Sequence, residues 1–316
     1  MFQIAFCCFN DARMTNEPLR VLKVDTKRRA VCKEDEHAFS YSIITFLMTS
    51  KWLLLLAFLN LQKAIQPVSN NENFLFITIK STESNHKTRL TVLEDTWLQN
   101  LKPSEYKIVS DSTNNVSQGL ENQVIKTSCG NSHSSQDLIC KLKHELLLFH
   151  RHNAHWSCHF DDDSYVNILN LKKFLSQYDS KKRYYFGKVS TGPIHIKGFE
   201  YWFGTGGAGY CLSRPVTQKM FQHVSKIFKR YFGLPDDIML AVLASKTANT
   251  TLTNIDLFHS HLEPTKLLRS HIKNQISLSQ TVLPGSLFQG YSTNKWMYYV
   301  HNYLHYKIKN LAIKLF

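Results

Sequence analysis

The sequence predicts an α/β domain with a mixed central sheet flanked by helices, behind an N-terminal membrane anchor. Three observations lead to this fold class. The chain of 316 residues is 43% hydrophobic and 20% charged, so it can bury a large core and is not a disordered protein. Strand-like and helix-like segments alternate from residue 73 onward, which is typical of α/β domains. A long apolar run, residues 43–61, precedes them all.

This apolar run has the length of a membrane-spanning helix. Its nineteen residues include a single charge, Lys51, and as a helix they would rise ~28 Å, close to the ~30 Å hydrocarbon layer of a bilayer. One alternative is a buried soluble helix. Another is translation from Met48, which would give a short signal peptide or anchor. We expect an uncleaved signal anchor.

The flanking charges predict the orientation of the anchor. Five basic residues precede it closely: Lys23, Lys27, Arg28, Arg29 and Lys33. Fewer follow it, so the positive-inside rule leaves residues 1–42 in the cytoplasm, residues 62–72 as a short stem and residues 73–316 in the lumen. The N-glycosylation sequons at Asn115 and Asn249 agree with a luminal body.

From residue 73 the predicted elements follow one another as in an α/β domain. Runs of β-branched and aromatic residues predict strands, and apolar residues at helical spacing predict helices. The predicted strands are 73–80, 106–111, 156–160 and 184–189. The predicted helices are 86–98, 134–149, 168–178, one that begins at 213, and 235–244. Ser134 and Asp137 form a capping box, and we expect Asp236 to cap the last helix.

The cysteines fit an oxidising compartment. Cys129, Cys140, Cys158 and Cys211 would lie in the lumen, where they can form two disulfides; the alternative is that they are small buried hydrophobic residues. The other three cysteines precede the anchor. The sequence has no Cys-X-X-Cys pair, which argues against a zinc or redox motif.

Most of the net charge of +14 belongs to the body. Residues 1–66 contribute +3, from 9 basic and 6 acidic residues, and the remainder contributes +11. Such an excess attracts anionic ligands, for example nucleotide phosphates or acidic membranes. The sequence has no zinc-finger spacing, RNA-binding aromatic motif or dense basic helix, so we expect no nucleic-acid partner.

A triplet of acids indicates a metal-dependent site. Asp161, Asp162 and Asp163 follow a hydrophobic strand, and ligands of open α/β sheets gather at the carboxyl ends of strands. Three adjacent carboxylates repel one another and need a compensating cation. Their hard oxygen atoms suit Mn²⁺ or Mg²⁺ bound with a diphosphate. A solvated acidic turn is the alternative.

Three further motifs accompany the triplet. Residues 202–211 place four glycines between aromatic residues, so the backbone can approach a ligand while the rings stack on it; a plain glycine-rich hairpin is the alternative. Asp236 and Asp237 form a carboxylate pair at a helix start. His259 and His261 offer imidazoles to a metal.

Together these motifs resemble those of the Fringe glycosyltransferases. The resemblance lies in HWSCHFDDDSY, YWFGTGGAGYCLSR, LPDD and LFHSHLE, with TIKSTESNHKTRLTVLEDTW upstream, and it extends from about residue 74 to residue 263. It implies a GT-A fold in a single-pass type II protein of the Golgi membrane. It also implies transfer of β-1,3-linked GlcNAc from UDP-GlcNAc, with inversion, to O-linked fucose on EGF repeats such as those of Notch receptors, which modulates Notch signalling. The implied cofactor is Mn²⁺, with Mg²⁺ as a substitute.

The resemblance also assigns roles residue by residue. Asp163 and His261 match the Mn²⁺ ligands. Arg89 and Asp162 match donor-binding positions, and Asp237 matches the catalytic base. The disulfides of the family match Cys129–Cys140 and Cys158–Cys211.

The chain departs from the family pattern near the acceptor side. Ile238 and Met239 replace a frequent Cys-Thr pair, and residues 299–316 lack the expected cysteine-bearing end. The alternatives are related β-1,3-transferases, adding glucose to O-linked fucose or galactose to O-linked GalNAc, and a non-catalytic secreted glycan-binding protein of the same fold. The presence of Asp163 and Asp237 favours an enzyme.

Overall fold

The computed structural model describes residues 74–262, 271–279 and 293–305. The expected cytoplasmic segment (1–42), anchor (43–61) and stem (62–72) lie outside the described residues, so these assignments stay predictions. The chain divides into two units, residues 1–68 and 69–316, and all described residues belong to the second. Within the described ranges, no helix is both long enough and apolar enough to cross a membrane.

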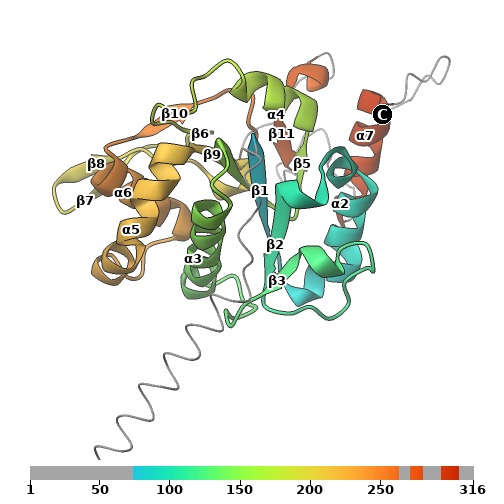
Figure 1. Cartoon of the computed structure of the whole chain (residues 1–316), viewed down its shortest axis with the longest axis horizontal. Helices are drawn as coiled ribbons and strands as arrows, with labels where there is room; N and C mark the ends of the chain where they lie inside the picture. Colours follow the sequence, from blue (N-terminus) through green and yellow to red (C-terminus); the bar gives the residue numbers. More distant parts are fainter. Residues whose placement is uncertain (1–73, 263–270, 280–292, 306–316) are drawn as a thin grey trace, which may run out of the picture. The chain divides into compact units, whose positions relative to one another are not determined.

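A seven-stranded mixed sheet forms the centre of the domain (Figure 1). Its order is β10-β6-β9-β4-β1-β2-β3. These strands are β1 (Leu75–Lys80), β2 (Tyr106–Ser110), β3 (Val124–Lys126), β4 (Trp156–Asp161), β6 (Tyr185–Gly187), β9 (Tyr210–Ser213) and β10 (Leu252–Asn254). β9 runs antiparallel to both neighbours, and the remaining pairs are parallel. The predicted mixed sheet is confirmed.

Two short antiparallel pairs lie outside this sheet. β5 (Ser164–Val166) pairs with β11 (Ser277–Ser279), and β7 (Ile194–Ile196) pairs with β8 (Phe199–Tyr201). The first pair ties the segment after the acid triplet to a segment more than 100 residues later in the chain. The second is a hairpin that Figure 1 shows beside α6.

Helices cover the sheet in two groups. α3 (Ser135–His152), α5 (Arg214–Arg230) and α6 (Asp236–Ala248) contribute to one hydrophobic cluster, and α2 (Thr91–Asp95), α4 (Ile168–Leu175) and α7 (Trp296–His305) contribute to another. The short helical turns are η2 (Glu83–Asn85), η3 (His86–Leu90), η4 (Trp97–Asn100), η5 (Pro103–Glu105), η6 (Glu121–Gln123), η7 (Gly206–Ala208), η8 (Ile272–Asn274) and η9 (Thr293–Lys295).

Successive side chains of β1 point alternately into these two hydrophobic clusters. Leu75, Ile77 and Ile79 belong to the cluster with α2, α4 and α7, whereas Phe76 belongs to the cluster with α3, α5 and α6. Because successive side chains of a strand point to opposite faces, Lys80 lies on the Phe76 side. Every residue of β1 is buried, Lys80 included. A lysine at the buried end of the central strand requires anionic partners.

Most predicted elements are present, with differences in detail. The predicted helix 86–98 is divided into the π-helical turn η3, α2 and the 3-10 turn η4, because the backbone leaves helical geometry at Thr96 (φ −121°, ψ −108°). The cap at Ser134 is confirmed, since its Oγ accepts the Asp137 N–H at 3.2 Å. The predicted capping box is incomplete, because the Asp137 carboxylate accepts from Ser132 and the Ser134 N–H donates to Ser132 Oγ. β9 begins at the last two residues of the glycine-rich segment and was not among the predicted strands.

Candidate active site

A polar cleft of about 270 Å³ lies at the carboxyl ends of the central strands. β1 and β4 are parallel, and Lys80 pairs in register with Asp161, so the acid triplet emerges beside the end of β1. All five residues to which the resemblance assigns donor, metal or base roles line this one cleft: Arg89, Asp162, Asp163, Asp237 and His261. They come from four separate segments of the chain.

Arg89 joins the second and third acids of the triplet. Its Nη1 donates to Asp162 Oδ1 at 2.7 Å and to Asp163 Oδ2 at 3.2 Å. Asp162 is nearly buried and also accepts from Ser81 Oγ (2.7 Å) and Asn85 Nδ2 (2.9 Å). Four hydrogen-bonding groups are therefore held together at the predicted donor-binding position.

Asp163 is the more available acid. Its side chain is 36% exposed, against 5% for Asp162. Desolvation and the charges of Asp161 and Asp162 raise the pKa of Asp163 to about 7. A carboxyl group that is crowded by like charges is stabilised in its ionised form by a nearby cation. Asp163 is thus suited to a metal ion.

His261 lines the same cleft and lies beside the glycine turn. A Cβ atom on Gly207 would lie 2.9 Å from His261 Nδ1, so the absence of a side chain at residue 207 leaves room for the imidazole. One carboxylate and one imidazole, completed by diphosphate and water oxygens, form a donor set that suits Mn²⁺. The residues therefore fit the predicted ion.

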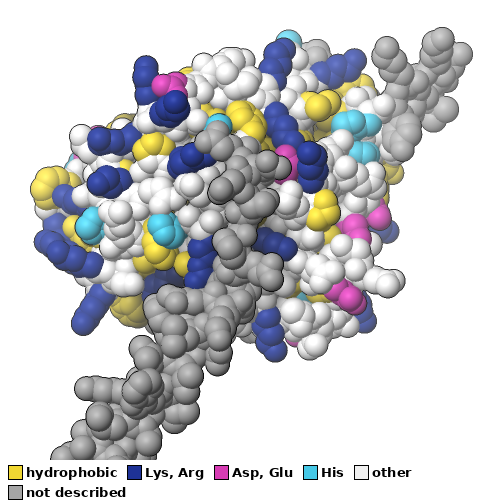
Figure 2. Space-filling view, viewed as in Figure 1, with side chains coloured by type: hydrophobic (Ala, Val, Ile, Leu, Met, Phe, Trp, Pro, Cys, Tyr) yellow, Lys and Arg dark blue, Asp and Glu magenta, His cyan; other side chains and the backbone are white. Residues whose placement is uncertain are grey.

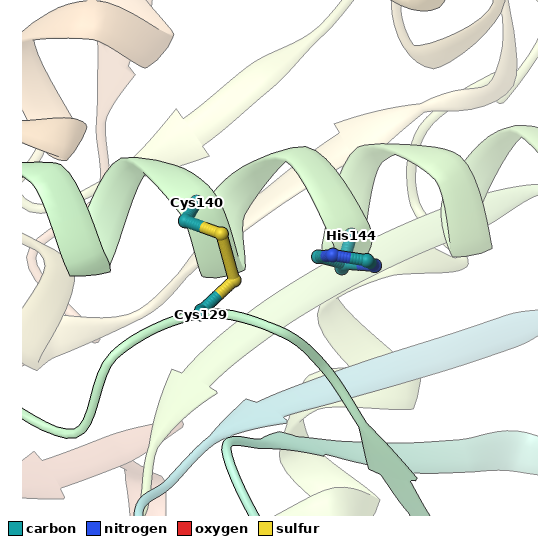
Figure 3. Close-up of side chains that lie close together, drawn as sticks. All are labelled: Cys129, Cys140 and His144. Atoms are coloured by element: carbon teal, nitrogen blue, oxygen red, sulfur yellow. A yellow bond between two sulfur atoms is a disulfide. The ribbon is translucent and has the colours of Figure 1, made fainter. Parts of the chain in front are cut away.

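A second cluster of side chains that can bind metals, outside the cleft, is not a metal site. Among the described residues, Cys129, Cys140 and His144 are the only three such side chains with ligand atoms within 4.8 Å of one another. Figure 3 shows that the two sulfur atoms are bonded to each other, with an S–S length of 2.08 Å. Disulfide sulfurs are not thiolates and do not bind zinc.

Both predicted disulfides are present. Cys129–Cys140 joins the loop before α3 to that helix. Cys158–Cys211 joins directly opposed residues of β4 and β9, with Cα atoms 4.1 Å apart. This bridge fixes the strand that leads into the acid triplet against the strand that follows the glycine turn.

The two acids at the start of α6 have different environments. Burial alone would raise the pKa of Asp236, but the charge of Lys80 lowers it; Lys80 Nζ donates to Asp236 Oδ2 at 2.5 Å. Burial and the charge of Asp236 raise the pKa of Asp237 to about 6, and its Oδ1 accepts the Ile238 N–H at 2.8 Å. The expectation that Asp236 caps α6 is wrong, because Pro235 is the N-cap residue and Asp236 binds Lys80 instead.

The aromatic residues of the glycine segment are not among the residues that line the cleft. Tyr210 is buried and its ring stacks on His159, with centroids 4.9 Å apart. Trp202 is 45% exposed, and its indole N–H donates to Glu200. Gly209 has φ +80°, and a Cβ atom there would lie 2.8 Å from His159 O and would overlap the Phe160 ring. Gly209 therefore permits close packing of the turn on β4.

Sequence reasoning missed three buried charged residues at the cleft: Lys80 belongs to its lining, and Glu145 and His159 do not. Lys80, Glu145 and His159 are buried, and ion pairs join them to one another and to Asp236 and Asp161. The available signal was a charged residue on the buried face of an apolar strand or helix. Lys80 and His159 lie within segments that carry the family resemblance, but the resemblance assigned neither of them a role, and Glu145 lies outside those segments.

The surface agrees with the predicted preference for anionic ligands. Figure 2 shows many Lys and Arg side chains and few acids on the visible face. Between residues 181 and 230 the chain has ten Lys or Arg residues and one acid, Glu200. Asn115 and Asn249, the predicted glycosylation acceptors, are both exposed.

Comparisons with known proteins identify the family. A family model described as Fringe-like matches residues 70–289. The Fringe glycosyltransferase of Drosophila melanogaster is 34% identical over 232 residues, which cover 68% of this chain and 56% of the relative. The β-1,3-N-acetylglucosaminyltransferase lunatic fringe of Xenopus laevis is 34% identical over 226 residues (66% and 59%). The human β-1,3-N-acetylglucosaminyltransferase manic fringe is 31% identical over 232 residues (67% and 71%).

Solved glycosyltransferases share a more distant likeness. The galactosyltransferase LgtC has a TM-score of 0.40 at 10% identity, covering 73% of this chain and 96% of that protein. Mouse xyloside xylosyltransferase 1 has a TM-score of 0.36 at 10% identity, with 58% and 85% covered. These scores are too low to carry an argument. The chain spans between half and two thirds of the length of the Drosophila and Xenopus relatives. The family match covers more than half of the chain and includes every motif of the cleft, and the chain belongs to the Fringe-like family.

Proposed function

We propose that this chain is a metal-dependent, inverting glycosyltransferase of the GT-A type. It transfers β-1,3-linked GlcNAc from UDP-GlcNAc to O-linked fucose on EGF repeats, such as those of Notch receptors, and so modulates Notch signalling. The observation that supports this most is the meeting of Arg89, Asp162, Asp163, Asp237 and His261 in one cleft. Relatives named β-1,3-N-acetylglucosaminyltransferases support the reaction type.

The acid-triplet side of the cleft suits the donor. Asp163 and His261 would hold Mn²⁺, or Mg²⁺ in its place. A bound Mn²⁺ supplies charge neutralisation for the diphosphate, so that UDP is a good leaving group without a proton. Arg89 brings a guanidinium to the same side, held in place by Asp162. Asp162 thereby orients the guanidinium of Arg89, and because its own charge is paired it does not repel the donor diphosphate.

The α6 side suits the acceptor. Asp237 takes the proton of the fucose hydroxyl as the oxygen of that hydroxyl bonds to the anomeric carbon of the donor. The bond between this carbon and the UDP oxygen breaks in the same step, so the configuration inverts. A carboxylate whose pKa of about 6 lies near neutral pH is an effective proton acceptor that is still ionised at pH 7.

A transfer assay with a panel of donors and acceptors tests this proposal. The purified full-length chain is incubated with Mn²⁺, a series of UDP-sugars, and fucosylated EGF and thrombospondin repeats. We expect GlcNAc to be added to the EGF repeat in a β-1,3 linkage, and we expect EDTA to stop the reaction. Glucose transfer to the thrombospondin repeat would identify a related transferase. Binding without any transfer would identify a glycan-binding protein.

We also propose that the chain is a type II protein of the Golgi membrane with its catalytic domain in the lumen. The support is the apolar run at 43–61 and its basic flank. Protease added to intact microsomes is expected to remove residues 1–42 and spare the body, and glycosidase treatment is expected to shift the mass at Asn115 or Asn249. An unglycosylated, membrane-free protein would contradict this proposal.

A further inference from the structure

A chain of five charged residues connects two cleft-lining acids, Asp161 and Asp236, through three buried side chains, one of which, Lys80, also lines the cleft. Lys80 Nζ lies 2.5 Å from Asp236 Oδ2 and 3.7 Å from Glu145 Oε2. The other oxygen of Glu145 lies 2.7 Å from His159 Nδ1, and His159 Nε2 lies 3.3 Å from Asp161 Oδ1. The order is therefore Asp236, Lys80, Glu145, His159 and Asp161, with alternating sign when both cations are protonated.

The strand alternation places these groups on one side of the sheet. Lys80 ends β1 and His159 lies near the end of β4, both on the face that α3 covers. Glu145 comes from the middle of α3, and its side chain has no exposed surface. Asp236 begins α6. The pair of Lys80 and Asp236 thus fastens the first turn of α6 to the central strand, across 156 positions of sequence.

The pairs keep all of these groups charged. Burial alone would lower the pKa of Lys80, but Asp236 and Glu145 raise it well above its usual value. Burial would likewise lower the pKa of His159, which Glu145 instead raises to about 9. The pKa of Glu145 is lowered by His159 and Lys80 despite its burial. At neutral pH, Lys80 therefore offers a permanent positive charge to Asp236.

Lys80 distinguishes two adjacent carboxylates. Asp236 and Asp237 both line the cleft, but Lys80 is bonded to Asp236 only. Among the described residues, no lysine, arginine or histidine lies within ion-pair distance of Asp237. A carboxylate bonded to a buried ammonium is a weak proton acceptor. Asp237, which has no such cation beside it in the described part of the chain, is therefore the stronger base. When the environments of two neighbouring carboxyl groups separate their pKa values, they determine which of the two acts as the base.

We propose that Lys80 is a positioning residue that assigns the role of base to Asp237, by binding Asp236 and fixing the first turn of α6. This inference rests on the proposed function, because it concerns the base of that transfer reaction. Glu145 on α3 forms an ion pair with Lys80, and His159 balances the negative charge of Glu145. The buried charges thereby determine which of two neighbouring acids accepts the proton of the acceptor hydroxyl.

Several charged groups surround Asp237 and belong to the test. They are Asp236 on the same helix, Lys80 on β1, Glu145 and Lys141 on α3, Asp161 after His159 on β4, Tyr185 on β6, and Arg89, Asp163 and His261 along the cleft. Asp236 and Lys80 are the side-chain charges that act most on Asp237, with opposite sign. Removing Asp236 is therefore expected to lower the pKa of Asp237, and removing Lys80 is expected to raise it.

The experiment measures the pH dependence of kcat/KM for transfer by the full-length chain. Lys80→Met removes the cation and is expected to move the acidic limb of the profile to higher pH by about one unit, because an unpaired Asp236 then repels the charge of Asp237. In the double variant Lys80→Met/Asp236→Asn, the acidic limb should return to its wild-type pH or move to a lower pH. UDP affinity, measured by calorimetry with Mn²⁺, should change less than about threefold.

Lys141→Met is the matched control. Lys141 is also a buried lysine that lines the cleft, but it binds Ser81 O and Asp111 Oδ1 and has no contact with Asp236. Its loss is expected to lower the melting temperature and to move the acidic limb much less than Lys80→Met does, because Lys141 is not among the charges that act most on Asp237. If Lys80→Met lowers stability and leaves the limb in place, Lys80 is only structural and the inference is overturned.

Two further outcomes are distinguishable. If Lys80→Met does not fold, Asp236→Asn alone carries the test: its limb should move to lower pH, and an unchanged limb overturns the inference. Loss of all transfer by folded Asp236→Asn, with Asp237→Asn active, would make Asp236 the base and also overturn it. Absence of transfer by the wild-type chain would instead overturn the proposed function.

Discussion

Replacement of Asp237 by asparagine tests the centre of the proposed mechanism. The amide keeps the size of the side chain, and its Oδ1 can still accept the Ile238 N–H that Asp237 accepts at 2.8 Å. What the variant loses is an oxygen that can take a proton. General-base assistance is typically worth about 10²–10⁴-fold in rate, or ~3–5 kcal/mol of barrier. We therefore expect kcat for transfer to fall by at least about 100-fold.

The pH dependence of the wild-type enzyme provides the second part of this test. Burial and Asp236 raise the pKa of Asp237 from 3.8 to about 6, and only the ionised form accepts a proton. About 90% of the group is ionised at pH 7 and about 10% at pH 5. Activity should thus fall about tenfold between these values as pH decreases. In Asp237→Asn this acidic limb should be absent from the residual rate.

The assay measures transfer to a fucosylated EGF repeat together with UDP and Mn²⁺ binding by calorimetry. Binding should change less than about threefold, because Asp237 acts on the acceptor and not on the donor. Asp256→Asn is the control, since it removes the same charge from an exposed carboxylate outside the cleft lining. Near-normal transfer by Asp237→Asn would assign the base to another residue. Simultaneous loss of UDP and Mn²⁺ binding would place Asp237 in the donor site.

Further substitutions test the metal site, the Cys158–Cys211 disulfide and the glycine turn. Asp163→Ala should abolish Mn²⁺-dependent UDP binding and His261→Ala should weaken it, with circular dichroism unchanged; normal transfer in EDTA would refute this metal site. Replacing Cys158 and Cys211 by alanine should lower stability by ~4 kcal/mol in the chain-entropy model, for a sequence separation of 53; free thiols at both positions in non-reduced wild-type peptides would contradict the crosslink. Gly209→Ala should lower stability by more than ~2 kcal/mol, because its φ is +80° and a Cβ atom would overlap Phe160. Gly192→Ala, where a Cβ atom meets nothing within 4 Å, should change the melting temperature little.

The sequence predicted the elements whose signals are local. β1 and β4 are runs of β-branched and aromatic residues, and α3 begins at a capping serine, so each was predictable from neighbouring residues. Residue types and positions pointed to Asp162, Asp163, Asp237 and His261, but their individual roles, and Arg89 altogether, came from the resemblance to a family. Nothing in the spacing of these residues indicates that Arg89 meets Asp162 or that His261 lies beside the glycine turn. Such meetings depend on the order of strands in the sheet.

The roles of the two α6 acids required the structure for the same reason. Position at a helix start suggested that Asp236 is a cap, because acids are favoured in the first turn. The partner that decides otherwise, Lys80, lies 156 positions away in the sequence and reaches Asp236 from the end of β1. Similarly, Tyr210 seemed suited to stack on a ligand, but pairing of β9 with β4 places its ring against His159.

The cost of the buried charges supports a functional interpretation of their position. Ion pairs in a protein interior often stabilise less than well-packed apolar groups of the same volume, because desolvation offsets their attraction. Lys80, Glu145 and His159 nevertheless lie among apolar residues between α3 and the central strands, and the chain they form ends at Asp236 on one side and Asp161 on the other. These ends adjoin the proposed base and the proposed metal ligand. A core built for stability alone would not need charges at this place, whereas an enzyme that must hold five carboxylates around one cleft does. The buried cations compensate Asp161 and Asp236, and they leave Asp163 and Asp237 as the acids available to a metal ion and to an acceptor proton.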